Sequence, residues 1–112
     1  MSNFIPYYGD VGKLPTNENH FNCRWNVPGV KVLFSMTRRG NAVVCHFSSD
    51  KKGRRKLKQA INDFCESIFE RCEWCEMIIG PIKKDSIKRL SEKCGFSQIG
   101  QKDNIYIMMR SR

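Results

Sequence analysis

Residues 41–80 read "NAVVCHFSSDKKGRRKLKQAINDFCESIFERCEWCEMIIG", two β-rich apolar runs on either side of one long amphipathic segment. Between the runs, apolar residues recur at the spacing of one helix face: Leu57, Ala60, Ile61, Phe64, Cys65, Ile68 and Phe69. Both flanking runs are apolar at nearly every position, which is typical of strands covered on two faces. The stretch therefore predicts a right-handed strand–helix–strand unit with parallel strands.

The preceding residues add a strand to this unit. The run "VKVLFSM" at 30–36 is β-rich and apolar, and it is joined to the run at 41–47 through the Gly40-Asn41 step. Such a step supplies the positive φ that a tight hairpin turn requires. We therefore expect an antiparallel hairpin directly before the long helix.

The last third of the chain predicts a second helix and a closing hairpin. A helix is expected at 83–94, because its apolar residues share one face and Gly95 suits the left-handed position after a helix end. The runs at 96–100 and 105–110 then read as two antiparallel strands around a polar turn. The predicted order is β-β-α-β-α-β-β, an α/β fold with a sheet of mixed direction.

The N-terminal residues carry no such pattern. They hold Pro6, Pro15 and Pro28 and scattered aromatic residues without a helical or strand period. We therefore expect an irregular N-terminal arm at 1–28, packed through its aromatic side chains, and an α/β domain at 29–112.

Composition and charge limit the functions to consider. A chain of 112 residues with a formal charge of +9 is one domain that favours anionic partners, namely nucleic acid, an acidic protein or a phosphorylated small molecule. A soluble protein with surplus lysine is the plainer alternative. No apolar run approaches the ~20 residues of a membrane span, and the N-terminus lacks the features of a secretory signal. The six cysteines then read as reduced thiols, and we expect a cytoplasmic protein.

Two short motifs carry a resemblance to a known family. The loop "DKKGRR" at 50–55 opens the long helix, and "KRLSEKCGF" at 88–96 ends the second. In this strand order they resemble the C-terminal two-thirds of the GCN5-related N-acetyltransferases, the GNAT family, whose motifs read Q/R-x-x-G-x-G/A and N-x-x-A-x-x-L-Y-E-K-x-G-F. The family's Asn place holds Lys84 and its Tyr place holds Ser91. The resemblance is greatest to short, divergent GNAT-like proteins of bacteriophages, which implies the host cytoplasm.

The resemblance implies an acetyl-CoA site at the start of the long helix. A helix N-terminus suits phosphate because its N–H groups are unpaired and its dipole end is positive. The basic cluster at 51–56 has two other interpretations, a solvated charge run or a contact with a nucleic-acid backbone. The residues that the resemblance places beside pantetheine and pyrophosphate are Val44, Phe47, Lys52, Gly53, Arg54 and Arg55.

Few side chains are candidates for proton transfer in such a reaction. Tyr106 on the last strand is a candidate proton donor in place of the family's Tyr, and His46 is a candidate proton acceptor with a pKa near neutrality. No metal is expected. The Cys72-x-x-Cys75 pair reads as packed thiols, with half of a zinc site or a redox pair as alternatives.

Two functions follow from this reading. The first is an acetyl-CoA-dependent N-acyltransferase with degenerate motifs. The second keeps the fold without the chemistry, as a basic phage-type protein that binds an acidic host protein or nucleic acid.

Overall fold

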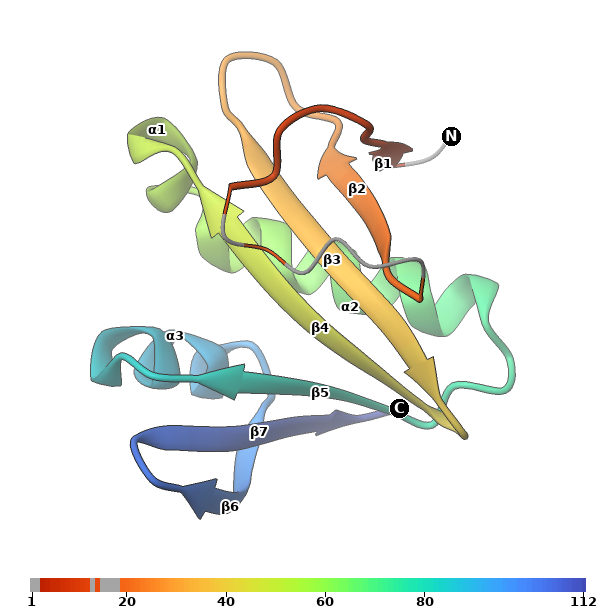
Figure 1. The fold of residues 1–112 in the computed structure, drawn as a ribbon, viewed down its shortest axis with the longest axis vertical. Coiled ribbons are helices and arrows are strands. Elements are labelled where there is room, and N and C mark those ends of the chain that lie inside the picture. Colours follow the sequence, from red (N-terminus) through yellow and green to blue (C-terminus); the bar gives the residue numbers. More distant parts are fainter. Residues whose placement is uncertain (1–2, 13, 15–18) are drawn as a thin grey trace.

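The computed structural model describes residues 3–12, 14 and 19–112, and the remaining residues of the expected arm lie outside the described part. Its strands form one seven-stranded sheet in the order β1-β2-β3-β4-β5-β7-β6 (Figure 1). The β4–β5 pair is parallel and the other pairs are antiparallel. In chain order the elements are β1 (Phe4–Pro6), β2 (Phe21–Trp25), β3 (Val32–Arg39), β4 (Ala42–Ser49), α1 (Lys51–Arg54), α2 (Leu57–Arg71), β5 (Met77–Ile82), α3 (Asp85–Lys93), β6 (Ser97–Lys102) and β7 (Ile105–Ser111).

The strand–helix–strand unit at 41–80 is confirmed. The β3–β4 hairpin is in register from Val32 opposite Ser49 to Arg39 opposite Ala42, and Gly40 adopts φ +64° in its turn. β4 then leads through α1 and α2 to β5, which pairs with it in parallel. The α/β fold class predicted from the sequence is therefore confirmed.

The apolar stripe of α2 faces the sheet, as its spacing predicts. Six of its seven residues are buried and Phe69 is half-buried. The Phe64 ring stacks on Phe34 of β3, with centroids 4.3 Å apart and planes 3° apart. α2 passes behind β3 and β4 in Figure 1, so these rings form the core between helix and sheet. No helix in the described part of the chain is long and apolar enough to cross a bilayer.

α3 ends as its sequence predicts. Gly95 adopts φ +88°, its N–H donates to the carbonyl of Glu92, and the Phe96 N–H donates to the carbonyl of Ser91. These two bonds define the Schellman end, which only a residue tolerant of a left-handed conformation closes cheaply. The helix starts at Asp85, two residues later than the predicted 83.

The N-terminal segment is irregular only in part, because β1 and β2 extend the sheet. β2 pairs with β3, with Cys23 opposite Phe34, and both Cys23 and Trp25 are buried in the main core. Indole Nε1 of Trp25 donates to Oδ2 of Asp63 on α2 at 3.0 Å. The expectation of no strand in this segment was wrong, because strands of three and five residues are too short to show a period of two. β2 is held in the sheet by pairing with β3, and β1 by pairing with β2.

The parallel strands β4 and β5 are paired over only part of their length. The register runs from Ala42 opposite Met77 to Val44 opposite Ile79, although β4 continues to Ser49 and β5 to Ile82. Beyond this point the two strands diverge towards α1 and α3 (Figure 1). Pro81 has no N–H to donate, which helps to end the ladder.

Candidate functional site

A cavity of about 590 Å³ lies where β4 and β5 diverge. Its walls come from the free end of β4, the end of β5 and its connection to α3, and the facing sides of α2 and α3. The walls are mostly apolar, with Phe47 on β4, Leu57 and Ile61 on α2, and Ile87 on α3. A pocket of this size and lining suits a ligand with an apolar or amide-containing body.

The charges at this cavity are all positive. Arg54 of α1 lines it, and Lys83 and Lys84 line it from the connection between β5 and α3. No carboxylate is among the described residues that line it. Cations on two sides and an apolar body between them fit an anion with an extended uncharged chain.

The free part of β4 supplies backbone groups as well as side chains. Peptide groups alternate sides along a strand, and those of 45–49 on the β5 side have no β5 partner because the register ends at Val44. Val44 itself is paired with Ile79 at the apex of the divergence, whereas Phe47 lines the cavity. Of the two β4 residues predicted to flank a pantetheine chain, the structure therefore places Phe47 in the cavity.

Gly53 is required by packing and its amide is already engaged. An added Cβ would lie 2.7 Å from Cγ2 of Val32 and 2.9 Å from Oδ1 of Asp50. The Gly53 N–H donates to Oδ1 of Asp50 at 2.6 Å. This bond holds the pKa of the Asp50 carboxyl below its ordinary value. Asp50 thus occupies the position that the family motif gives to a Gln or Arg, and its exposed carboxylate places a negative charge of the protein's own at the loop.

The other predicted loop residues divide into two groups. Arg54 lines the cavity, whereas Lys52 and Arg55 are exposed outside its lining. α2 begins after Lys56 without a side-chain cap hydrogen bond. The N–H groups of the first turn of an α-helix have no partner within the helix, so this end of α2 is suited to an anion.

His46 lies at the cavity with its ring half-buried. It lines the wall from β4, and its Nδ1 is buried without a hydrogen-bond partner among the described residues. Burial, and secondarily the charge of His20, lower the pKa of His46. The imidazole is therefore held neutral, the form that accepts a proton.

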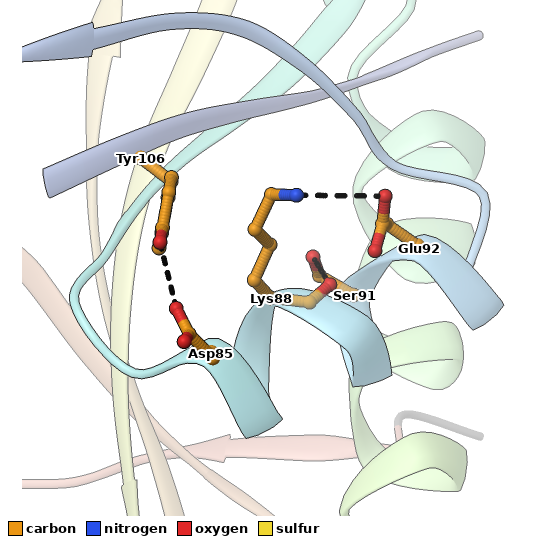
Figure 2. Close-up of polar contacts among 5 residues, drawn as sticks. All are labelled: Asp85, Lys88, Ser91, Glu92 and Tyr106. Carbon is orange, nitrogen blue, oxygen red and sulfur yellow. Dashed lines mark hydrogen bonds and ion pairs between the residues drawn. The ribbon is translucent and has the colours of Figure 1, made fainter.

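Tyr106 of β7 and Ser91 of α3 have different positions relative to the cavity (Figure 2). Tyr106 does not line the cavity; its hydroxyl donates to Oδ1 of Asp85 at 2.7 Å, and this bond raises the pKa of Tyr106. Ser91 lines the cavity and is buried, and its Oγ donates to the carbonyl of Lys88 at 2.7 Å. Nζ of Lys88 lies 3.9 Å from a carboxylate oxygen of Glu92. The structure thus brings His46 to the cavity and leaves Tyr106 outside its lining.

The thiols were assigned no site from the sequence, yet two of them line the cavity. Cys45 on β4 and Cys65 on α2 are free thiols there, and burial raises the pKa of Cys65 to about 12. Cys72 forms the C-terminal cap position of α2, and Cys75 is buried with its Sγ donating to the carbonyl of Met77. Among the described residues, no group of three or more potential metal-binding side chains occurs.

Two lysines at the cavity were also missed as site residues. Lys83 and Lys84 line the cavity, although neither belongs to the basic cluster at 51–56. The available signal was Lys84 in the family's Asn place, which puts a cation at the start of the second helix.

No family model and no curated protein matches the sequence. The structure is nonetheless similar to solved acetyltransferases. It matches AAC(6')-Ib in complex with ribostamycin and coenzyme A with a TM-score of 0.68 and 13% identity over 85% of this chain. It matches the GNAT domain of S. lividans PAT with a TM-score of 0.69 and 8% identity over 89% of this chain. A spermidine N-acetyltransferase SpeG chimera from Vibrio cholerae and hSSAT gives a TM-score of 0.66 and 12% identity over 85% of this chain.

These likenesses establish the fold as GNAT-like. The match spans 65%, 66% and 71% of the three proteins, which is about two thirds of the length of the first two.

Proposed function

We propose that this protein is an acyl-CoA-dependent N-acyltransferase, with acetyl-CoA as its simplest donor. The observation that carries the proposal is the divergence of β4 and β5 after three residue pairs, which leaves the 590 Å³ cavity. One protein of similar fold, AAC(6')-Ib, has been solved in complex with coenzyme A and in complex with acetyl-CoA.

The cavity has the groups that a bound donor needs. The unpaired peptide groups of 45–49 can hydrogen-bond the two amides of a pantetheine chain lying along β4. Arg54 on one side, and Lys83 and Lys84 on the other, can neutralise the phosphates, together with the uncapped start of α2.

The reaction requires one proton acceptor and one hydrogen-bond donor to the developing oxyanion. The acyl-CoA supplies a thioester, whose C–S bond breaks as the amine forms a C–N bond to the acyl carbon. Neutral His46 accepts the proton that the amine loses, and an unpaired N–H of β4 donates to the carbonyl oxygen as it gains charge. The leaving thiolate takes up a proton from water.

Calorimetric titration with acetyl-CoA tests the proposal. We expect saturable 1:1 binding, weakened about tenfold by Arg54→Glu because a charge beside the phosphates is reversed. Arg39→Glu is the matched control, since Arg39 is exposed at the far end of β3 and is not part of the cavity lining. Absence of binding at millimolar acetyl-CoA would contradict the proposal.

A second function is favoured by two observations. The Gly53 amide is bound by Asp50, and Ser91 replaces the family's Tyr at the cavity. A chain that binds the donor without turnover would act as a basic binding protein for an acidic host protein or nucleic acid. Its affinity for such a partner would fall steeply with salt and with Arg55→Glu.

A further inference from the structure

Four further cations adjoin Arg54 in α1 and in the turn before α2, without lining the cavity. Lys51, Lys52, Arg55 and Lys56 are exposed and lie within three residues of Arg54, which does line it. We call these four residues the outer basic surface. None of the four is within ion-pair distance of a described carboxylate, although Lys52 interacts electrostatically with Asp50.

This surface exceeds what the phosphates of a small donor can contact. Arg54, Lys83 and Lys84 already lie at the cavity, on two of its sides. The outer cations repel one another and the positive end of α2, so the free protein is destabilised by their proximity. A partner that carries many negative charges beside the cavity mouth would relieve this repulsion, whereas a single nucleotide tail would leave most of it.

The loop favours a donor with one phosphate over a donor with several. The Gly53 amide, which would help to hold a diphosphate, donates to Asp50 instead. β4 extends five residues, 45–49, beyond its last pair with β5, roughly 16 Å at the rise of a strand. An extended pantetheine chain with a single phosphate at its outer end suits such a slot.

We propose that the protein also takes its acyl group from an acidic carrier protein, whose phosphopantetheine arm enters the cavity while its acidic face docks on the outer basic surface. This inference rests on the proposed function, since it uses the same cavity and the same reaction. The thioester C–S bond on the arm breaks, the acceptor amine forms the C–N bond, its proton passes to His46, and the carrier's thiolate is reprotonated by water.

The test compares one acyl group on two donors. Affinities are measured by calorimetry for acetyl-CoA, for an acidic bacterial acyl carrier protein bearing acetyl-phosphopantetheine, and for the same carrier without its arm. We expect the armed carrier to bind more tightly than the carrier without an arm, because the arm fills the cavity. Lys51→Glu with Lys56→Glu should lower the affinity for the carrier about tenfold more than the affinity for acetyl-CoA. The reason is that the outer basic surface contacts the acidic face of the carrier, whereas acetyl-CoA contacts the cavity.

Arg39→Glu with Lys102→Glu is the matched control. Both residues are exposed at strand ends away from the cavity lining, and the change in net charge is the same. The inference would be overturned if the two double variants lost carrier affinity equally, or if the carrier bound equally well with and without its arm. If acetyl-CoA binds and the carrier does not, this inference fails and the proposed function stands. If neither donor binds, the proposed function fails as well.

Discussion

The backbone N–H of Gly53 donates to Oδ1 of Asp50 at 2.6 Å, at the junction between β4 and α1. Asp50 is the N-terminal cap of α1 and is exposed, so its carboxylate repels any phosphate that approaches this loop. Asp50→Asn should keep a capping side chain and remove the charge. We expect acetyl-CoA to bind about twofold to fivefold more tightly to this variant, the effect of one screened surface charge.

The control for Asp50 is Asp50→Ala, which removes both the charge and the cap. Its donor affinity should rise as for Asp50→Asn, whereas its thermal unfolding midpoint should fall below that of Asp50→Asn because the Gly53 amide loses its partner. Calorimetry and thermal unfolding separate the two effects. Weaker donor binding by Asp50→Asn would show that the carboxylate helps to hold the donor.

His46 should control the acid side of the pH–rate profile. Its pKa is lowered from the ordinary value of 6.5, so the imidazole stays neutral below that pH and kcat/KM should fall only under more acid conditions. His46→Gln should lower kcat/KM about a hundredfold or more by removing the proton acceptor. Burial is the main cause of the lowered pKa and the charge of His20 the lesser one, so His20→Gln should move the acid limb only slightly to higher pH. An acid limb that persists unchanged in His46→Gln would contradict this assignment.

The stability of the protein, like kcat/KM, should fall at acid pH because of His46. Because the folded protein binds this proton less readily than the unfolded chain, protonation of His46 favours unfolding. The free energy of unfolding should therefore be unaffected by His46 above its unfolded-state pKa of about 6.5. It should decrease as the pH falls below that value. Urea unfolding of the wild type and of His46→Gln at a series of pH values should show a smaller decrease in the variant.

Gly95→Ala should destabilise the protein through its backbone conformation. Gly95 has φ +88°, and a Cβ there would meet only an ordinary contact with Arg110 at 3.6 Å. The left-handed conformation alone should cost about 1–2 kcal/mol. Gly100→Ala is the control, since nothing lies within 4 Å of its added Cβ and its φ is not positive. Equal free energies of unfolding for the two variants would contradict a role for the α3 end.

Trp25 should show that the N-terminal strands belong to the core. Trp25→Phe removes a ring that is 1% exposed and leaves Asp63 without its indole partner, at a cost of about 2 kcal/mol. Trp74→Phe is the control; Trp74 is half-buried and contacts Arg38 through a cation–π interaction worth up to about 1 kcal/mol. A fragment of 29–112 should lack a cooperative unfolding transition. A cooperative transition in that fragment would support the expected boundary at 28.

Local patterns in the sequence were sufficient to predict α2, α3 and the strands from β3 to β7. The stripe from Leu57 to Phe69 defined α2, and Gly40 and Gly95 marked a turn and a helix end whose positive φ the structure reproduces. β2 escaped prediction because a five-residue strand is defined by its partner, and Cys23 is placed by Phe34 of β3. His46 and Arg54 were named from the sequence and line the cavity, whereas Lys83 lines it and was not named, since nothing local marks a lysine that becomes part of a cavity wall.

The sequence by itself determined the two longer helices, the strands from β3 onwards and the buried face of α2, because those properties repeat with a short local period. Tertiary structure alone decided where β4 and β5 part, and so which residues meet around the cavity. Arg54 and Lys84 are thirty positions apart, yet they line one cavity because the β4–β5 register ends at Val44 and Ile79. That register depends on packing between the helices and the sheet as a whole, which no local period encodes.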